Sequence, residues 1–181
     1  MVKKSLDSEL AAHPVKLFFG LISSNPDLFL QVEQIASKRF GEIDVASPHI
    51  PFECTQYYEK ELGSNLLRKF IAFEDLIVPG ALSEVKVYTI ELEEQFRQDG
   101  RRAINIDPGY LSAWQVVLAS TKNFSHRIYL SHGVFAELTF FYQGKAFQPL
   151  PWAYPDFKSK EYLDFFNCAR TTWLRQTQPK S

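Results

Sequence analysis

Compact apolar runs and helical repeats alternate over the first part of the chain. Residues 15–23 form an apolar run that is typical of a buried strand. Residues 24–27 then carry a capping side chain and a proline, which together predict the start of a helix. Apolar residues recur at helical spacing from Leu28 to Phe40, and Gly41 predicts the end of that helix.

The same alternation continues toward residue 107. Residues 42–55 contain two prolines, which favours an extended edge strand over a central one. Residues 57–67 match neither a helix nor a strand clearly. Three further elements follow in order: a strand over 67–73, a helix over 82–96 after a Pro-Gly turn, and a strand over 102–107.

The later part of the chain predicts strands joined by turns. Alternating or apolar runs occupy residues 113–120, 127–131 and 134–142, and a turn then leads to a further strand at Phe147. We therefore expect a meander of antiparallel strands in this region. A last apolar repeat over residues 159–176 predicts a C-terminal helix.

The order of these elements predicts an α+β fold. Over residues 15–107 the order is strand, helix, strand, strand, helix, strand, which is the ferredoxin-like pattern of an antiparallel sheet with two packed helices. The β-meander and the C-terminal helix would extend this unit. We expect one domain over residues 14–176, preceded by a mobile tail over residues 1–13.

Composition and charge exclude several classes of partner. The net charge is −1, with 20 basic and 21 acidic residues, so nothing electrostatic indicates binding to nucleic acid or to an anionic membrane. No apolar run approaches the roughly 18 residues of a membrane span, and the first residues do not resemble a signal peptide. With only Cys54 and Cys168 as thiols, the chain is predicted to be cytoplasmic.

Polar residues interrupt the apolar pattern between residues 103 and 130. Asn105 and Asp107 lie two apart on a predicted strand, so their side chains face the same way. Pro108 and Gly109 are expected to end that strand, and a carboxylate at a strand end is a frequent general base or metal ligand. The alternative is that Asp107 accepts backbone N–H groups and shapes the turn.

The segment 121–127 is the strongest candidate for binding an anion. Lys122 supplies a point charge, Arg127 a bidentate fork, and Thr121 and His126 further donors, a set that suits phosphate or carboxylate. The alternative is an exposed polar hairpin turn, in which lysine and asparagine are common.

Two further segments contribute candidate pocket residues. Tyr57 and Tyr58 could line a pocket with Glu61 as its acid or base, or they could pack with their hydroxyls at the surface. Tyr154 is a candidate for the same pocket. Because Ser159 is the better N-cap of the last helix, Asp156 remains available to pair with an arginine or to bind a ligand, unless it only structures its loop.

A polar stripe crosses the predicted helix at residues 82–96. Lys86, Thr89 and Glu93 are three and four residues apart and overlap the apolar face. A solvated i, i+4 pattern is the ordinary interpretation, and a position facing the site is the alternative.

No cofactor or metal motif is present in the sequence. The four histidines form no metal-ligand pattern, there is no CxxC pair, and neither a P-loop nor a glycine-rich dinucleotide motif occurs. The sequence therefore predicts no metal site and names no cofactor.

Five segments together resemble a known family. They lie at residues 51–63, 105–111, 118–123, 126–130 and 152–157. In combination they resemble DUF4416, a bacterial family of unknown function, over residues 14–173. The resemblance implies no established activity and no site residues.

The leading hypothesis is therefore a protein that binds, and processes, a small anionic or phosphorylated molecule. Lys122, His126 and Arg127 would bind the anion, and Asp107 would act as base together with Glu61. A non-catalytic nucleotide- or anion-binding module is one alternative. A protein-interaction scaffold, with an exposed patch supplied by the phenylalanine-rich residues 135–147, is another.

Overall fold

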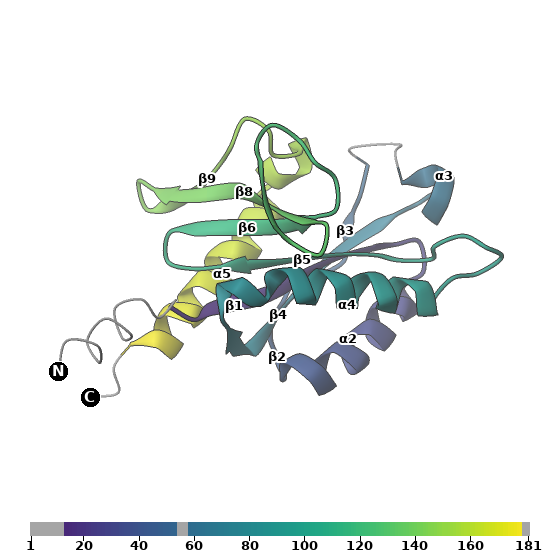
Figure 1. Cartoon of the computed structure of the whole chain (residues 1–181), viewed down its shortest axis with the longest axis horizontal. Helices are drawn as coiled ribbons and strands as arrows, with labels where there is room; N and C mark the ends of the chain where they lie inside the picture. Colours follow the sequence, from purple (N-terminus) through teal and green to yellow (C-terminus); the bar gives the residue numbers. More distant parts are fainter. Residues whose placement is uncertain (1–12, 54–57, 179–181) are drawn as a thin grey trace.

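The computed structural model describes residues 13–53 and 58–178, which hold a nine-stranded antiparallel sheet (Figure 1). The strand order is β2-β4-β1-β5-β6-β8-β7, while β3 pairs with β4 and β9 with β8. The strands are β1 (Val15–Ser23), β2 (Ile43–Ala46), β3 (Ile50–Pro51), β4 (Leu67–Ile77), β5 (Asn105–Leu111), β6 (Gln115–Ser120), β7 (Arg127–Ser131), β8 (Val134–Gln143) and β9 (Ala146–Pro149). The prediction of a mixed fold of helices and antiparallel strands is thereby confirmed.

The helices cover both faces of the sheet. They are α2 (Pro26–Phe40), the short α3 (Glu59–Leu62), α4 (Leu82–Gln95) and α5 (Lys160–Thr177), with 3₁₀ turns η1 (Pro79–Ala81) and η2 (Pro155–Lys158). Along β1 the side chains alternate, so Leu17 and Phe19 pack under α2 and α4 while Phe18 packs against α5. As predicted, Ser159 caps α5 by accepting the main-chain N–H of Tyr162. None of these helices combines the length and the apolar character that a membrane span requires.

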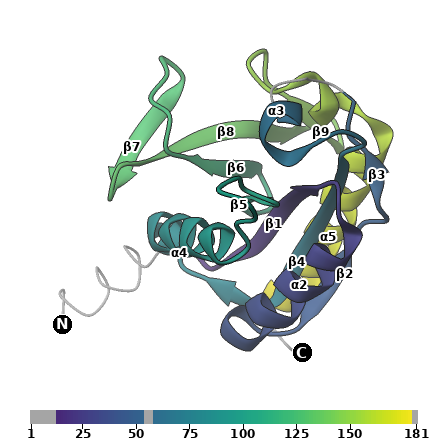
Figure 2. The same ribbon diagram turned by 90° about the vertical axis from the view of Figure 1, so that its right-hand side faces the viewer.

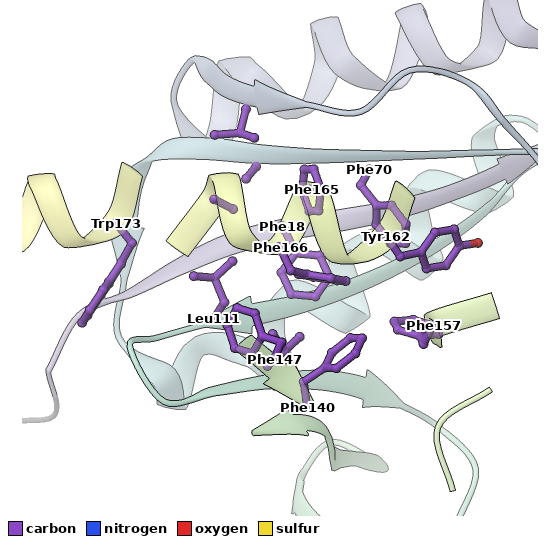
Figure 3. Close-up of a cluster of buried hydrophobic side chains, with 14 of the residues drawn as sticks. Phe18, Phe70, Leu111, Phe140, Phe147, Phe157, Tyr162, Phe165, Phe166 and Trp173 are labelled. Atoms are coloured by element: carbon purple, nitrogen blue, oxygen red, sulfur yellow. The ribbon is translucent and has the colours of Figure 1, made fainter. Parts of the chain in front are cut away.

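Phenylalanine is the most frequent residue in the core beneath α5 (Figure 3). The ring of Phe70 on β4 lies 4.6 Å from that of Tyr162, 5.1 Å from Phe165 and 5.4 Å from Phe166, measured between centroids. These contacts explain the high aromatic content of the sequence, because edge-on and offset rings fill a core without polar atoms.

The strands after residue 113 do not form the predicted meander. β8 lies between β6 on one side and both β7 and β9 on the other, so β7 does not touch β6 (Figure 2). The tight turn at His132 and Gly133, both at positive φ, joins β7 to β8 directly, whereas a longer loop separates β7 from β6.

The expected exposed patch over residues 135–147 is also absent. Phe140 and Phe147 from that segment are buried in the core. Three consecutive exposed apolar side chains lie instead on β7, at Ile128, Tyr129 and Leu130, and others are exposed elsewhere in the fold.

The strand β5 does not end at Asp107 as the sequence predicted. It continues through Pro108 and Gly109 to Leu111, paired with β1 over its whole length. Proline is tolerated there because residues 106 and 108 turn their main-chain groups away from β1, and pairing with β6 begins only at Gly109. Gly109 permits a close approach rather than a turn, since a Cβ would lie 2.5 Å from both the Phe18 ring and the Val117 oxygen.

Candidate functional site

A cavity opens where β5 and β6 separate. The two strands pair only between Gly109–Leu111 and residues 116–118, and beyond these pairs they diverge (Figure 1). The space between them is a cavity of about 270 Å³. Its lining comes from β4, α4, β5, β6, β8, the loops around them and η2: Phe52, Tyr58, Arg68, Lys86, Ile90, Glu93, Arg102, Asn105, Asp107, Leu118, Ala119, Ser120, Thr121, Lys122, Arg127, Glu137, Tyr154, Pro155, Asp156 and Phe157.

Side chains of α4 bind the open edge of β5. Lys86 donates from Nζ to the main-chain oxygen of Ile106 at 2.9 Å, and Glu93 Oε1 accepts the Ile106 N–H at 2.6 Å. These side chains replace the missing strand partner, so the backbone polar groups stay satisfied. The interpretation of Lys86, Thr89 and Glu93 as a solvated stripe is therefore wrong, because all three are buried.

Asp107 presents its carboxylate to the cavity between two cations. Asn105 donates from Nδ2 to Asp107 Oδ2 at 2.8 Å and fixes the orientation of the carboxylate. Arg68 Nη1 lies 3.7 Å from Oδ2, and Lys86 Nζ lies 3.7 Å from Oδ1. The side chain of Asp107 remains 27% exposed, so a ligand in the cavity can reach it.

Arg68 is a buried guanidinium whose hydrogen-bonding capacity is only partly used. It is 4% exposed and lies over the ring of Phe52, with its Nη2 3.7 Å from Asp156 Oδ2. Arg68 Nε and Asp156 Oδ1 are both buried without a hydrogen-bond partner among the described residues. The other Asp156 oxygen accepts the hydroxyl of Tyr162 at 3.0 Å, which fixes the carboxylate beside Arg68.

A glycine on β1 gives Arg68 its place. Gly20 pairs with Phe70 of β4 on one side and with Asp107 of β5 on the other. A Cβ at this position would lie 2.8 Å from Arg68 Nη1. The guanidinium can therefore reach across β1 toward Asp107 only because residue 20 has no side chain.

Arg102 binds the acidic groups at one end of the cavity. It donates to Glu61 from Nε at 2.8 Å and from Nη2 at 2.5 Å, and from Nη1 to Glu93 at 3.0 Å and to Asn105 Oδ1 at 3.1 Å. The hydrogen bond to Arg102 lowers the pKa of Glu61, whereas burial raises the pKa of Glu93. Glu61 does not line the cavity, and its ionised carboxylate is held by Arg102.

Glu137 organises the opposite end. Its Oε2 accepts from Arg127 Nε at 2.6 Å and lies 3.1 Å from His126 Nε2. Arg127 also donates from Nη1 to Ser120 Oγ at 2.8 Å and to the Lys122 main-chain oxygen at 2.9 Å. This arginine thus closes the β6–β7 loop, and Asp156 lies by Arg68 rather than pairing with Arg127 as one hypothesis allowed.

His126 lies outside the cavity lining. Its ring is stacked between Phe124, at 6.0 Å, and Trp152, at 5.3 Å between centroids. Its contact with the cavity is indirect, through Glu137.

Aromatic residues form the remaining wall. Tyr58 and Tyr154 line the cavity, and burial, with the Asp107 charge adding to it, raises the pKa of the Tyr58 hydroxyl. Tyr154 is half exposed at the mouth. Tyr57 and Cys54 lie outside the described residues.

The structure thus brings most of the predicted residues into one place. Eight of them line the cavity: Tyr58, Asn105, Asp107, Thr121, Lys122, Arg127, Tyr154 and Asp156. Sequence analysis did not assign Arg68, Arg102 and Glu137 to the site. Glu137 had a signal, because it is the one charge in β8, whereas Arg68 is one of four charged residues in β4 and does not stand out. Within residues 13–53 and 58–178, no cluster of three or more candidate side chains could hold a metal ion.

Comparison with known proteins decides the family. The sequence model described as "Domain of unknown function (DUF4416)" matches residues 13–173. The chain belongs to the DUF4416 family. This DUF4416 match includes every residue that lines the cavity. No match is found among curated proteins or among solved structures.

Proposed function

We propose that this DUF4416 protein binds a small anionic ligand, a phosphorylated molecule, in the cavity between β5 and β6. The observation that carries the proposal is the convergence of five cationic side chains on one cavity: Arg68, Lys86, Arg102, Lys122 and Arg127. Four carboxylates line the same cavity, at Glu93, Asp107, Glu137 and Asp156, so the cations exceed the anions there by one in a chain whose net charge is −1.

The cations divide into two groups. Arg102 and Arg127 are bound by carboxylates at hydrogen-bonding distance, and they build the walls. Arg68 and Lys86 form the second group, because they approach carboxylates only to 3.7 Å. The second group is therefore the one that a ligand anion would meet. A cavity of about 270 Å³ suits a small molecule, being just below the roughly 300–1,000 Å³ of drug-sized sites.

The test is binding of inorganic phosphate, sugar phosphates and nucleotides, measured by calorimetry and by thermal shift. A ligand at 100 times its Kd should add roughly 2.7 kcal/mol, which for this chain length is on the order of 5–10 °C. Lys122→Gln should weaken the binding, whereas Lys38→Gln, the same change on an exposed position of α2, should not. The proposal fails if no phosphorylated probe binds, or if both variants weaken binding equally.

One observation favours a catalytic role as a second candidate. Asp107 is oriented by Asn105 and accessible from the cavity, as a general base must be. Glu61 is a poor second base because its hydrogen bond with Arg102 lowers its pKa and so weakens it as a proton acceptor, and because it lies outside the lining. At saturating substrate, Asp107→Asn should lower the turnover rate about 10²–10⁴-fold. Unchanged turnover in that variant would exclude this role.

We infer further that the β2-β4-β1-β5 half of the sheet, with α2 and α4, is a ferredoxin-like unit. The support is that β4 lies between β1 and β2, and β1 between β4 and β5, in an antiparallel order. An experimental structure with another strand order would contradict this assignment.

A further inference from the structure

The groups around Asp107 form an incomplete hydrogen-bonding network. Asp107 Oδ2 accepts from Asn105, and both flanking cations stand 3.7 Å away, beyond hydrogen-bonding distance. Lys86 has three N–H donors, of which one is directed to the main-chain oxygen of Ile106. The cavity thus presents an acceptor between two sets of donors.

A second observation supports an opening in the same network. Arg68 Nε and Asp156 Oδ1 are buried polar atoms without a partner among the described residues. Buried polar groups in proteins are nearly always hydrogen-bonded, and each that is not requires an explanation. Arg68 lies near both Asp156 and Asp107. A ligand that draws its guanidinium and these two carboxylates together would therefore complete the network.

The chemistry of the three side chains selects the kind of ligand group. A phosphate oxygen accepts from Arg68 and Lys86 but is repelled by the carboxylate of Asp107. A hydroxyl donates its hydrogen to Asp107, and its two lone pairs accept from Lys86 and Arg68. One hydroxyl therefore satisfies all three groups. The phosphate itself is assigned to Thr121 and Lys122, which also line the cavity and are exposed, since they supply a hydroxyl and a positive charge and no carboxylate.

We propose that Asp107, Lys86 and Arg68 form a hydroxyl-binding subsite, and that the ligand class is hydroxylated phosphate monoesters, of which small sugar phosphates are the type. This inference rests on the proposed function of the cavity and specifies its substrate class. Asp107 is the residue that distinguishes such a ligand from inorganic phosphate.

The first experiment uses the unaltered protein and a series of probes. Inorganic phosphate, methyl phosphate, glycerol 3-phosphate and ribose 5-phosphate are titrated by calorimetry at pH 7. Methyl phosphate and glycerol 3-phosphate carry the same anionic group and differ in the hydroxyls. We expect the hydroxylated probes to bind at least about tenfold more tightly, the effect of one hydrogen bond to a charged group.

The second experiment uses Asp107→Asn, for which the two explanations predict opposite signs. If Asp107 acts only through its charge, its removal should tighten the binding of every anion. If it binds a ligand hydroxyl, Asp107→Asn should weaken ribose 5-phosphate about tenfold and leave inorganic phosphate unchanged or bound more tightly. Asp164→Asn, an exposed change of the same charge on α5, should alter neither affinity. Circular dichroism checks that both variants fold.

The possible failures are distinguishable. If no probe binds the unaltered protein, the proposed function fails together with the subsite. If methyl phosphate binds as tightly as glycerol 3-phosphate, or if Asp107→Asn tightens ribose 5-phosphate, the subsite is refuted while phosphate binding stands. The probe series alone decides the matter if Asp107→Asn does not fold.

Discussion

Replacing Arg127 by alanine should strongly destabilise the protein, because it leaves Glu137 buried without its main partner. The two side chains are 6% and 3% exposed, and Arg127 Nε lies 2.6 Å from Glu137 Oε2. Loss of one partner from a buried ion pair costs about 3–5 kcal/mol. The change also removes the donors to Ser120 Oγ and to the Lys122 oxygen, which hold the β6–β7 loop.

The magnitude can be measured by urea unfolding followed by circular dichroism. The midpoint should fall while the slope of free energy against urea stays unchanged. For a chain of 181 residues, a loss of about 3–5 kcal/mol corresponds to a fall in Tm of roughly 6–20 °C. Lys160→Ala is the control, since its pair with Asp164 is exposed and should contribute nothing measurable.

A double-mutant cycle separates the ion pair from other effects. Glu137→Gln removes the buried charge, so Arg127→Ala should cost less in that background, with a coupling of about 1–3 kcal/mol. Additive single changes, or a loss no larger than that of Lys160→Ala, would refute the reasoning.

Three further predictions concern glycines and an ion pair. Gly20→Ala should displace Arg68, lower stability by about 1–3 kcal/mol and weaken phosphate binding, as urea unfolding and calorimetry would show. Gly109→Ala should lower stability more than Gly20→Ala, because its Cβ would lie 2.5 Å from a buried ring of β1 and from a main-chain oxygen of β6. Equal stability of the two variants would contradict this. The hydrogen bond with Arg102 lowers the pKa of Glu61 below its usual 4.5. The ion pair therefore stabilises the fold above pH 4.5, and this stabilisation is lost as the pH falls through the lowered pKa. Glu61→Gln should therefore reduce the Tm at pH 7 and have a smaller effect at pH 3.

Local patterns predicted the elements better than their arrangement. The helix from residue 26 follows from apolar periodicity and its Asn25 cap, and the helix from residue 82 follows from apolar periodicity, all of which are properties of neighbouring residues. The extension of β5 through Pro108 could not be predicted in this way. It depends on contacts with residues far away in the sequence: β6 begins to pair only at Gly109, and the Phe18 ring lies against that glycine.

The site was predictable where polar residues cluster in sequence and not where the fold brings them together. Asn105, Asp107 and Lys122 lie in polar segments and were identified. Glu137 is the one charge in β8, and Arg68 is one of four charged residues in β4, so neither strand shows from its sequence alone which charge faces a cavity. Only the sheet order, which places β4 two strands from β5, shows that Arg68 faces Asp107.

The division of charges within the cavity supports a binding role over a purely structural one. Arg102 donates three hydrogen bonds to carboxylates, and Arg127 donates one at 2.6 Å to Glu137, which is how a folded protein stabilises a buried charge. If all the charges were structural, Arg68 would be expected to show the same geometry. Instead it lies 3.7 Å from both neighbouring carboxylates, with a buried nitrogen unpartnered, at the point where β1 has a glycine to admit it. A buried guanidinium that lines a cavity, with one nitrogen that has no hydrogen-bond partner among the described residues, has the arrangement expected of a group that completes its hydrogen bonds with a ligand.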